Sequence, residues 1–242
     1  MFREDGERMS RRQEDRRDGI EHQNEVKRLL DRLRDLPEDV GLINEFSLHC
    51  ELSNVDTPFH RWLARRAHGG DSYAQEFMGA LDIDTECPRG YPHVVEELND
   101  HTPEQWYQMS ASQGNPLARI RLSASGDGEA CREGAERGIL VAQHCMGVPL
   151  VPTEGAVRWF KMGADRGYLP SLLSLVKVYR ERARRSRSPE DFAEALRWCR
   201  RVIDLGDPEG RIHLRGVVGD MTKDDALQDV LVSRFLAHSP KR

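Results

Sequence analysis

The chain has 242 residues, a mass of 27.7 kDa, a formal net charge of −5 at pH 7 and a sequence pI of about 6.0. Its hydrophobic fraction of 38% and charged fraction of 32% favour a thin fold with much surface per residue. The acidic net charge and pI give no global sign of nucleic-acid binding. The sequence contains no apolar run long enough to cross a membrane and no apolar leader, so we expect a cytoplasmic protein. The five cysteines form no CxxC pair and are expected to be reduced.

The N-terminal part of the chain predicts a tail and two helices. Residues 1–18 are rich in Arg, Asp and Glu and are expected to be disordered. Residues 19–56 carry apolar side chains at helical spacing, first up to Pro37 and then from about Glu38 to Leu52. We interpret 19–56 as a pair of N-terminal capping helices.

From residue 57 onward one spacing recurs: an aromatic residue, a small residue five positions later, and a glycine three positions after that. All four tryptophans of the chain occupy the aromatic column, which would rarely happen by chance, so the spacing indicates an internal repeat. The aromatic residues are Trp62, Trp106, Trp159 and Trp198, with Ala130 in the third copy. The small residues are Ala67, Ala111, Ala135 and Ala164, with Ile203 in the fifth copy. The glycines are Gly70, Gly114, Gly138, Gly167 and Gly206.

Each copy predicts a helix, a tight turn and a second helix. The aromatic residue fills space between helices, the small residue allows close approach, and the glycine ends the first helix in the left-handed conformation. A second small residue, four positions after the glycine, is expected to pack on the first helix of the same pair. Hydroxyl or Asx residues before proline predict helix starts. They occur at Thr57-Pro58, Thr102-Pro103, Asn115-Pro116, Ser188-Pro189 and Asp207-Pro208.

Two copies match the repeat pattern best. One contains Trp159-Phe160, Gly163-Ala164, Gly167 and Ser171. The other contains Trp106-Tyr107, Ser110-Ala111, Gly114 and Ala118. They resemble the Sel-one-like repeat family, which is related to the tetratricopeptide repeats. The resemblance implies an all-α solenoid of about five helical-hairpin repeats over residues 57–220, sealed by a C-terminal capping helix within 221–242. The glycines are 44, 24, 29 and 39 residues apart, which is less regular than in the family. The short second step predicts stunted helices around 123–129.

The resemblance also implies a non-enzymatic protein–protein interaction module of bacterial type. It would act as an adaptor or as an immunity protein that neutralises a cognate toxin or effector; a scaffold or regulatory subunit of a larger complex is the alternative. First helices of such solenoids line one surface, usually the concave one. Positions six, three and two before the small residue share a helical face, and arginine suits carboxylate recognition, so we expect an acidic protein partner. The candidate protein-binding residues are Arg61, Arg65, Gln105, Gln108, Arg132, Arg158, Lys161, Arg197, Arg200 and Arg201. An ordinary solvated face is the competing interpretation.

Other chemistry has weaker support in the sequence, and we expect no enzyme, cofactor or metal. No HExxH, GxSxG, P-loop or GxGxxG pattern occurs. His144 and the adjacent Cys145 would point about 100° apart on a helix, so a buried pair is favoured over a catalytic one. Asp82, Asp84 and Glu86 alternate with other residues, and an acidic loop is favoured over a cation site there. Cys87 has His93 and His101 nearby but no second cysteine at the spacing of a zinc site. RNA binding by the basic segment 180–187 remains a less favoured alternative, because acidic residues follow it and no aromatic residue interleaves.

Overall fold

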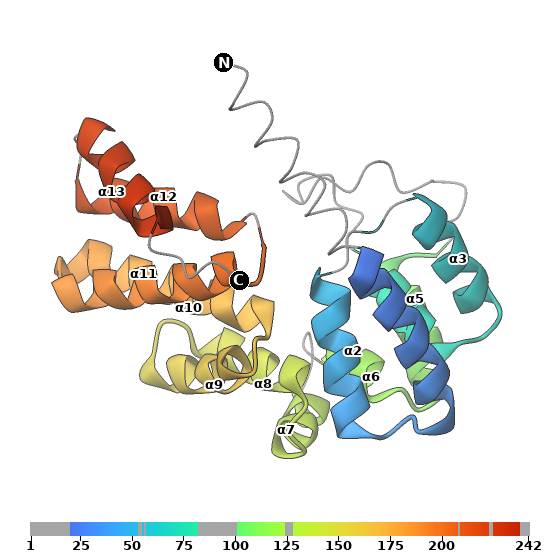
Figure 1. Ribbon diagram of the computed structural model, residues 1–242. Helices are drawn as coiled ribbons and strands as arrows, with labels where there is room; N and C mark the ends of the chain where they lie inside the picture. Colours follow the sequence, from blue (N-terminus) through green and yellow to red (C-terminus); the bar gives the residue numbers. More distant parts are fainter. Residues whose placement is uncertain are drawn as a thin grey trace, which may run out of the picture. The chain divides into compact units, whose positions relative to one another are not determined.

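A computed structural model describes residues 20–52, 55, 57–81, 101–123, 128–207, 209–222 and 225–237 (Figure 1). The regular structure of these residues is helical throughout and includes no strand, which confirms the all-α class. The predicted tail and the predicted acidic loop with Asp82, Asp84 and Glu86 lie outside the described residues, as do Cys87 and His93.

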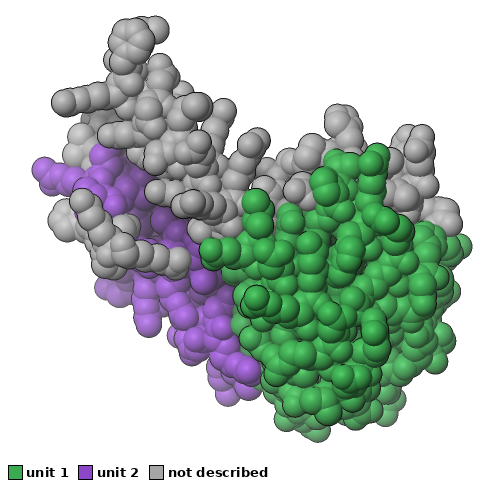
Figure 2. Space-filling view, turned by 45° about the vertical axis from the view of Figure 1, so that its right-hand side comes forward, with its two compact units in different colours: residues 1–146 green, residues 147–242 purple. Residues whose placement is uncertain are grey.

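The chain divides into two compact units, residues 1–146 and 147–242 (Figure 2). The division falls within 57–220, which the sequence pattern treats as one array. Unit 1 begins with a helix over residues 20–35, and its other helices are α2 (Val40–Leu52), α3 (Thr57–His68), α4 (Ser72–Ala80), α5 (Pro103–Ser112), α6 (Pro116–Ser123), α7 (Glu129–Glu136) and α8 (Leu140–Gly147). Unit 2 contains the 3-10 turn η2 (Val148–Leu150) and helices α9 (Glu154–Asp165), α10 (Leu169–Ser186), α11 (Pro189–Asp204), α12 (Glu209–Met221) and α13 (Asp225–Ala237). Within each unit, helices pack mainly on their neighbours in sequence.

The five glycine turns share one conformation. Each glycine has φ between 83° and 91°. Its N–H donates to the carbonyl three residues earlier, and the next N–H donates to the carbonyl five residues earlier, over 2.9 to 3.4 Å. These bonds satisfy carbonyls that a helix end would otherwise leave unpaired. The predicted left-handed glycine turn is confirmed at Gly70, Gly114, Gly138, Gly167 and Gly206.

Small residues bring the two helices of a pair together. The predicted second small residue is fully buried at Ser171 and Ala142. A Cβ added to Gly163 would lie 2.5 Å from Ser171 Oγ, and one added to Gly134 would lie 2.9 Å from Ala142 Cβ. The predicted packing of the second small residue on the first helix of the same pair is therefore confirmed for α7–α8 and α9–α10.

The tryptophan column is buried unevenly. Trp106 and Trp198 are 0% and 1% exposed, whereas Trp62 and Trp159 are only half-buried. On α9 the neighbouring Phe160 enters the core instead, and consecutive helical residues point about 100° apart. The sequence spacing identified the helix correctly but not which aromatic fills the core in every copy.

Several predicted helix starts are confirmed. Thr102 Oγ1 accepts from Gln105 N at 3.2 Å, and Gln105 Oε1 accepts from Thr102 N at 2.7 Å, which completes a capping box. Ser188 Oγ accepts from Asp191 N at 3.3 Å. Asn115 and Asp207 likewise cap α6 and α12. The short α6 and α7, of eight residues each, agree with the predicted stunted helices.

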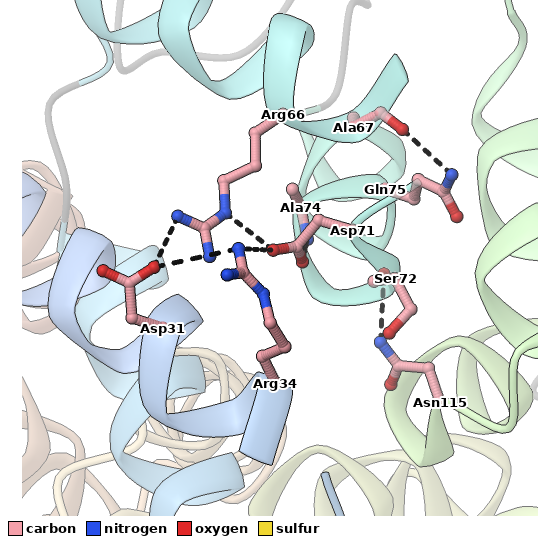
Figure 3. Close-up of polar contacts among 9 residues, drawn as sticks. All are labelled: Asp31, Arg34, Arg66, Ala67, Asp71, Ser72, Ala74, Gln75 and Asn115. Carbon is pink, nitrogen blue, oxygen red and sulfur yellow. Dashed lines mark hydrogen bonds and ion pairs between the residues drawn. The ribbon is translucent and has the colours of Figure 1, made fainter. Parts of the chain in front are cut away.

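The predicted N-terminal capping pair is tied to the first glycine turn by a polar cluster (Figure 3). Arg66 on α3 donates from Nε to Asp71 Oδ2 at 2.6 Å. Its Nη1 lies 2.8 Å from Asp31 Oδ1 on the first helix. Asp71 also caps α4 by accepting from Ala74 N at 3.0 Å. Arg66, which directly follows the candidate Arg65, thus points into the fold.

Helix α2 contacts more than its sequence neighbours. Phe46 packs edge-on against Tyr73 of α4, with ring centroids 5.6 Å apart. Asn44 binds the turn between α7 and α8, donating to Gly138 O at 3.0 Å and accepting from Leu140 N at 2.8 Å. Repeats of an open solenoid touch only their neighbours, so this contact departs from a regular stack. Within unit 1, α2 thus joins helices that are distant in sequence.

Candidate protein-interaction surface

In unit 2 an ion pair joins the first helices of two successive pairs, α9 and α11. Arg201 on α11 reaches α9, where its Nη1 lies 3.1 Å from Asp165 Oδ1 and its Nη2 donates to Asp165 O at 3.3 Å. Helix α10 packs against both α9 and α11. We group the four candidate residues of α9 and α11 under one name, the unit 2 surface: Arg158, Lys161, Arg197 and Arg201.

On α9 the division between core and surface is clear. Val157, Phe160 and Ala164 are buried, whereas Arg158 and Met162 are exposed on the opposite side. Arg158 forms no ion pair with a described residue. Lys161 is half-buried, with Nζ 5.9 Å from the centre of the Tyr179 ring. Helix α9 thus presents two cations without a carboxylate partner in the described structure.

On α11 the arginines have different surroundings. Arg197 is exposed, with Nη1 3.4 Å from Glu194 and its guanidinium 5.3 Å from the Trp198 ring. Arg200 instead donates to Phe235 O on α13, and its guanidinium lies 4.1 Å from the Phe235 ring. The structure therefore brings Arg197 together with Arg201 but places Arg200 against the last helix.

In unit 1 the candidate residues form a weaker pattern. Arg61 and Arg65 are exposed on α3, and Arg65 Nε donates to Arg61 O at 3.2 Å. Gln105 is used in the capping box of α5, and Gln108 donates to Glu104 at 3.2 Å. Arg132 is exposed on α7. The cations of unit 1 are more dispersed than those of unit 2.

The basic segment 180–187 is engaged within unit 2. Arg182 lies 2.5 Å from Glu154 of α9, and Arg180 lies 2.5 Å from Asp220 of α12. Arg184 and Arg185 pair with Glu181, and Arg187 donates to Asp220 O at 2.8 Å. The segment forms the end of α10 and ties this helix to α9 and α12.

Sequence analysis missed an exposed apolar stretch beside α9. Val148, Leu150 and Val151 are 53%, 38% and 49% exposed, and Met162 is 46% exposed. The stretch VPLVP has no helical or strand period. Its exposure depends on which helices pass nearby, and local spacing does not encode that.

The buried thiols are poor nucleophiles. Burial, and then the neighbouring Cys131, raises the pKa of Cys145 to about 12. Burial likewise raises the pKa of Cys199 to about 12. Both thiols stay protonated near neutral pH, whereas a nucleophilic cysteine needs its thiolate.

Comparison of the chain with protein-family models, curated proteins and solved structures found no significant match. The resemblance to Sel-one-like repeats therefore rests on the residues of the chain. Among the described residues, no helix combines the length and apolar character needed to span a bilayer.

Proposed function

We propose that the chain is a non-enzymatic protein–protein interaction module, built as a divergent α-solenoid of about five Sel-one-like helical pairs. The ion pair between Arg201 and Asp165 carries this proposal, because it joins the first helices of two successive pairs. Aligned first helices are how helical-pair solenoids build extended binding surfaces. Guanidinium groups on such a face bind carboxylates through paired hydrogen bonds.

The partner is an acidic protein surface, and the module acts as an adaptor or as an immunity protein that neutralises a cognate toxin or effector. A scaffold or regulatory subunit of a larger complex uses the same surface. RNA binding through 180–187 is less favoured, because its arginines already contact Glu154, Glu181 and Asp220.

Charge reversal at the unit 2 surface tests the proposal. The triple variant Arg158→Glu, Lys161→Glu and Arg197→Glu should lose the protein partner captured from cells of the source organism. The matched control reverses three exposed cations on the second helices α10 and α12: Lys177→Glu, Arg211→Glu and Arg215→Glu. Circular dichroism must show both variants folded. Equal capture by both variants, or equal loss, would refute the role of this surface.

A further inference from the structure

One face of α9 combines exposed apolar and basic groups. Gly155, Arg158 and Met162 lie at helical spacings of three and four, so they share one face. Leu150 lies over the start of this face, with Cδ1 3.3 Å from the position that a Cβ on Gly155 would take. We call Leu150, Arg158 and Met162 the α9 patch.

The α9 patch carries uncompensated positive charge. Helix α9 contains two acids, and each is already paired with an arginine from another helix: Glu154 with Arg182 at 2.5 Å and Asp165 with Arg201 at 3.1 Å. Lys161 contacts an aromatic ring and no described carboxylate. The charge that remains around Arg158 is therefore complementary to an acidic group on a partner.

The apolar groups of the α9 patch can supply binding energy that charges alone do not. Leu150 and Met162 are 38% and 46% exposed, and Val148 and Val151 of the adjoining stretch are about half exposed. Binding energy concentrates in a few apolar or arginine anchors that lose their water, whereas charges mainly guide association. Met and Arg are both enriched in protein interfaces.

We propose that the α9 patch is the anchor of the interface and that its occupant is an acidic amphipathic helix of the partner protein. Arg158 and Met162 are one helical turn apart, roughly 6 Å between Cβ atoms. A partner helix presents a carboxylate and a large apolar side chain at the same separation when they are three or four residues apart. This inference rests on the proposed function and specifies the chemistry of the partner.

Site-specific crosslinking in cells of the source organism tests the inference. A photoreactive benzoylphenylalanine replaces Met162 in one variant and Ile212 in the other. Ile212 on α12 is the matched control, because it is 61% exposed and lies outside the patch. The Met162 variant should crosslink to a protein segment with an acid and a large apolar residue three or four positions apart. The Ile212 variant should not crosslink to that segment.

The crosslinked segment, made as a synthetic peptide, then provides a quantitative readout. Arg158→Ala and Met162→Ala should each weaken its binding about tenfold or more, and the controls Arg215→Ala and Ile212→Ala less than about twofold. Two results overturn this inference but leave the proposed function standing. In one, only the Ile212 variant crosslinks to a protein. In the other, the segment crosslinked to the Met162 variant contains no acidic residue. No protein crosslink from either position contradicts both.

Discussion

Asn44 and Leu140 are joined across 96 positions of sequence by a hydrogen bond of 2.8 Å, from the Leu140 N–H to Asn44 Oδ1. The same amide donates to Gly138 O at 3.0 Å, and Asn44 is only 2% exposed. One side chain on α2 thus satisfies two backbone groups at the turn between α7 and α8. It also links the N-terminal helices to a distant glycine turn.

Asn44→Ala should therefore destabilise the protein by about 1–3 kcal/mol, because the buried Leu140 N–H loses its acceptor. Urea denaturation followed by circular dichroism measures the change. Glu45→Ala, at a half-exposed neighbour on the same helix, should change the free energy of unfolding by less than about 0.5 kcal/mol. Equal effects from the two variants would show that the Asn44 contact does not hold unit 1 together.

Gly163→Ala should destabilise unit 2 by about 1–3 kcal/mol, although alanine favours helices. The added Cβ would lie 2.5 Å from Ser171 Oγ and 3.1 Å from its Cβ, so the Ser171 hydroxyl must rotate, and α9 and α10 must shift by a few tenths of an ångström. Gly219→Ala is the control, since its nearest neighbour would be 3.7 Å away. It should be neutral or stabilising by up to about 1 kcal/mol in thermal denaturation. A rise in melting temperature for Gly163→Ala would contradict the close packing of this pair.

The two carboxylates on Arg66 should contribute unequally. Burial alone would lower the pKa of Arg66, but hydrogen bonds with Asp71 and Asp31 outweigh it, and the pKa is raised. The Asp71 and Arg66 side chains are 11% and 15% exposed, whereas Asp31 is 66% exposed.

Asp71→Asn should therefore cost about 3 kcal/mol, as expected when a buried ion pair loses one partner, and Asp31→Asn less than about 1 kcal/mol. Chemical denaturation at low and moderate salt compares the two variants. A larger loss for Asp31→Asn would mean that the exposed carboxylate is the main support of the cluster.

His60 should make stability depend on pH. It is 3% exposed, neither ring nitrogen has a hydrogen-bond partner among the described residues, and burial lowers its pKa from 6.5. The unfolded chain then binds the proton more readily, so the free energy of unfolding decreases as pH falls below 6.5 towards the folded-state pKa.

His60→Leu should flatten this dependence between about pH 5 and 7 and raise stability at pH 6 by about 1 kcal/mol, since it removes an unpaired buried polar group. Denaturation curves across that range test this expectation. Burial also lowers the pKa of His213, so the remaining slope should persist in the His60 variant. An unchanged slope would exclude His60 as a source of the pH dependence.

The glycine turns and helix caps could be predicted from the sequence because they depend on local chemistry. A positive φ at Gly167 and the capping box of Thr102 involve residues within one turn of each other. The partners of the arginine side chains could not be predicted in this way, because they are distant in sequence. Arg182 donates to Glu154 and Arg200 donates to Phe235 O, across 28 and 35 positions.

The same limit explains what was missed at the candidate surface. Spacing assigned Arg158, Lys161, Arg197 and Arg201 to one helical face, and the structure joins their two helices through the ion pair between Arg201 and Asp165. Met162 has the same position in its copy as Arg201, but spacing gave no sign that Leu150 would be exposed beside them. Exposure depends on which neighbouring helices cover a residue.

The central claim is that this chain functions by binding a protein. The most direct measurement is affinity capture of the tagged chain from its source cells after nuclease treatment, followed by native mass spectrometry of the eluate. The account predicts one stoichiometric protein partner that stays bound at moderate salt. Two results would contradict this prediction. One is an eluate without any protein at a defined stoichiometry. The other is a parallel capture without nuclease that recovers RNA alone.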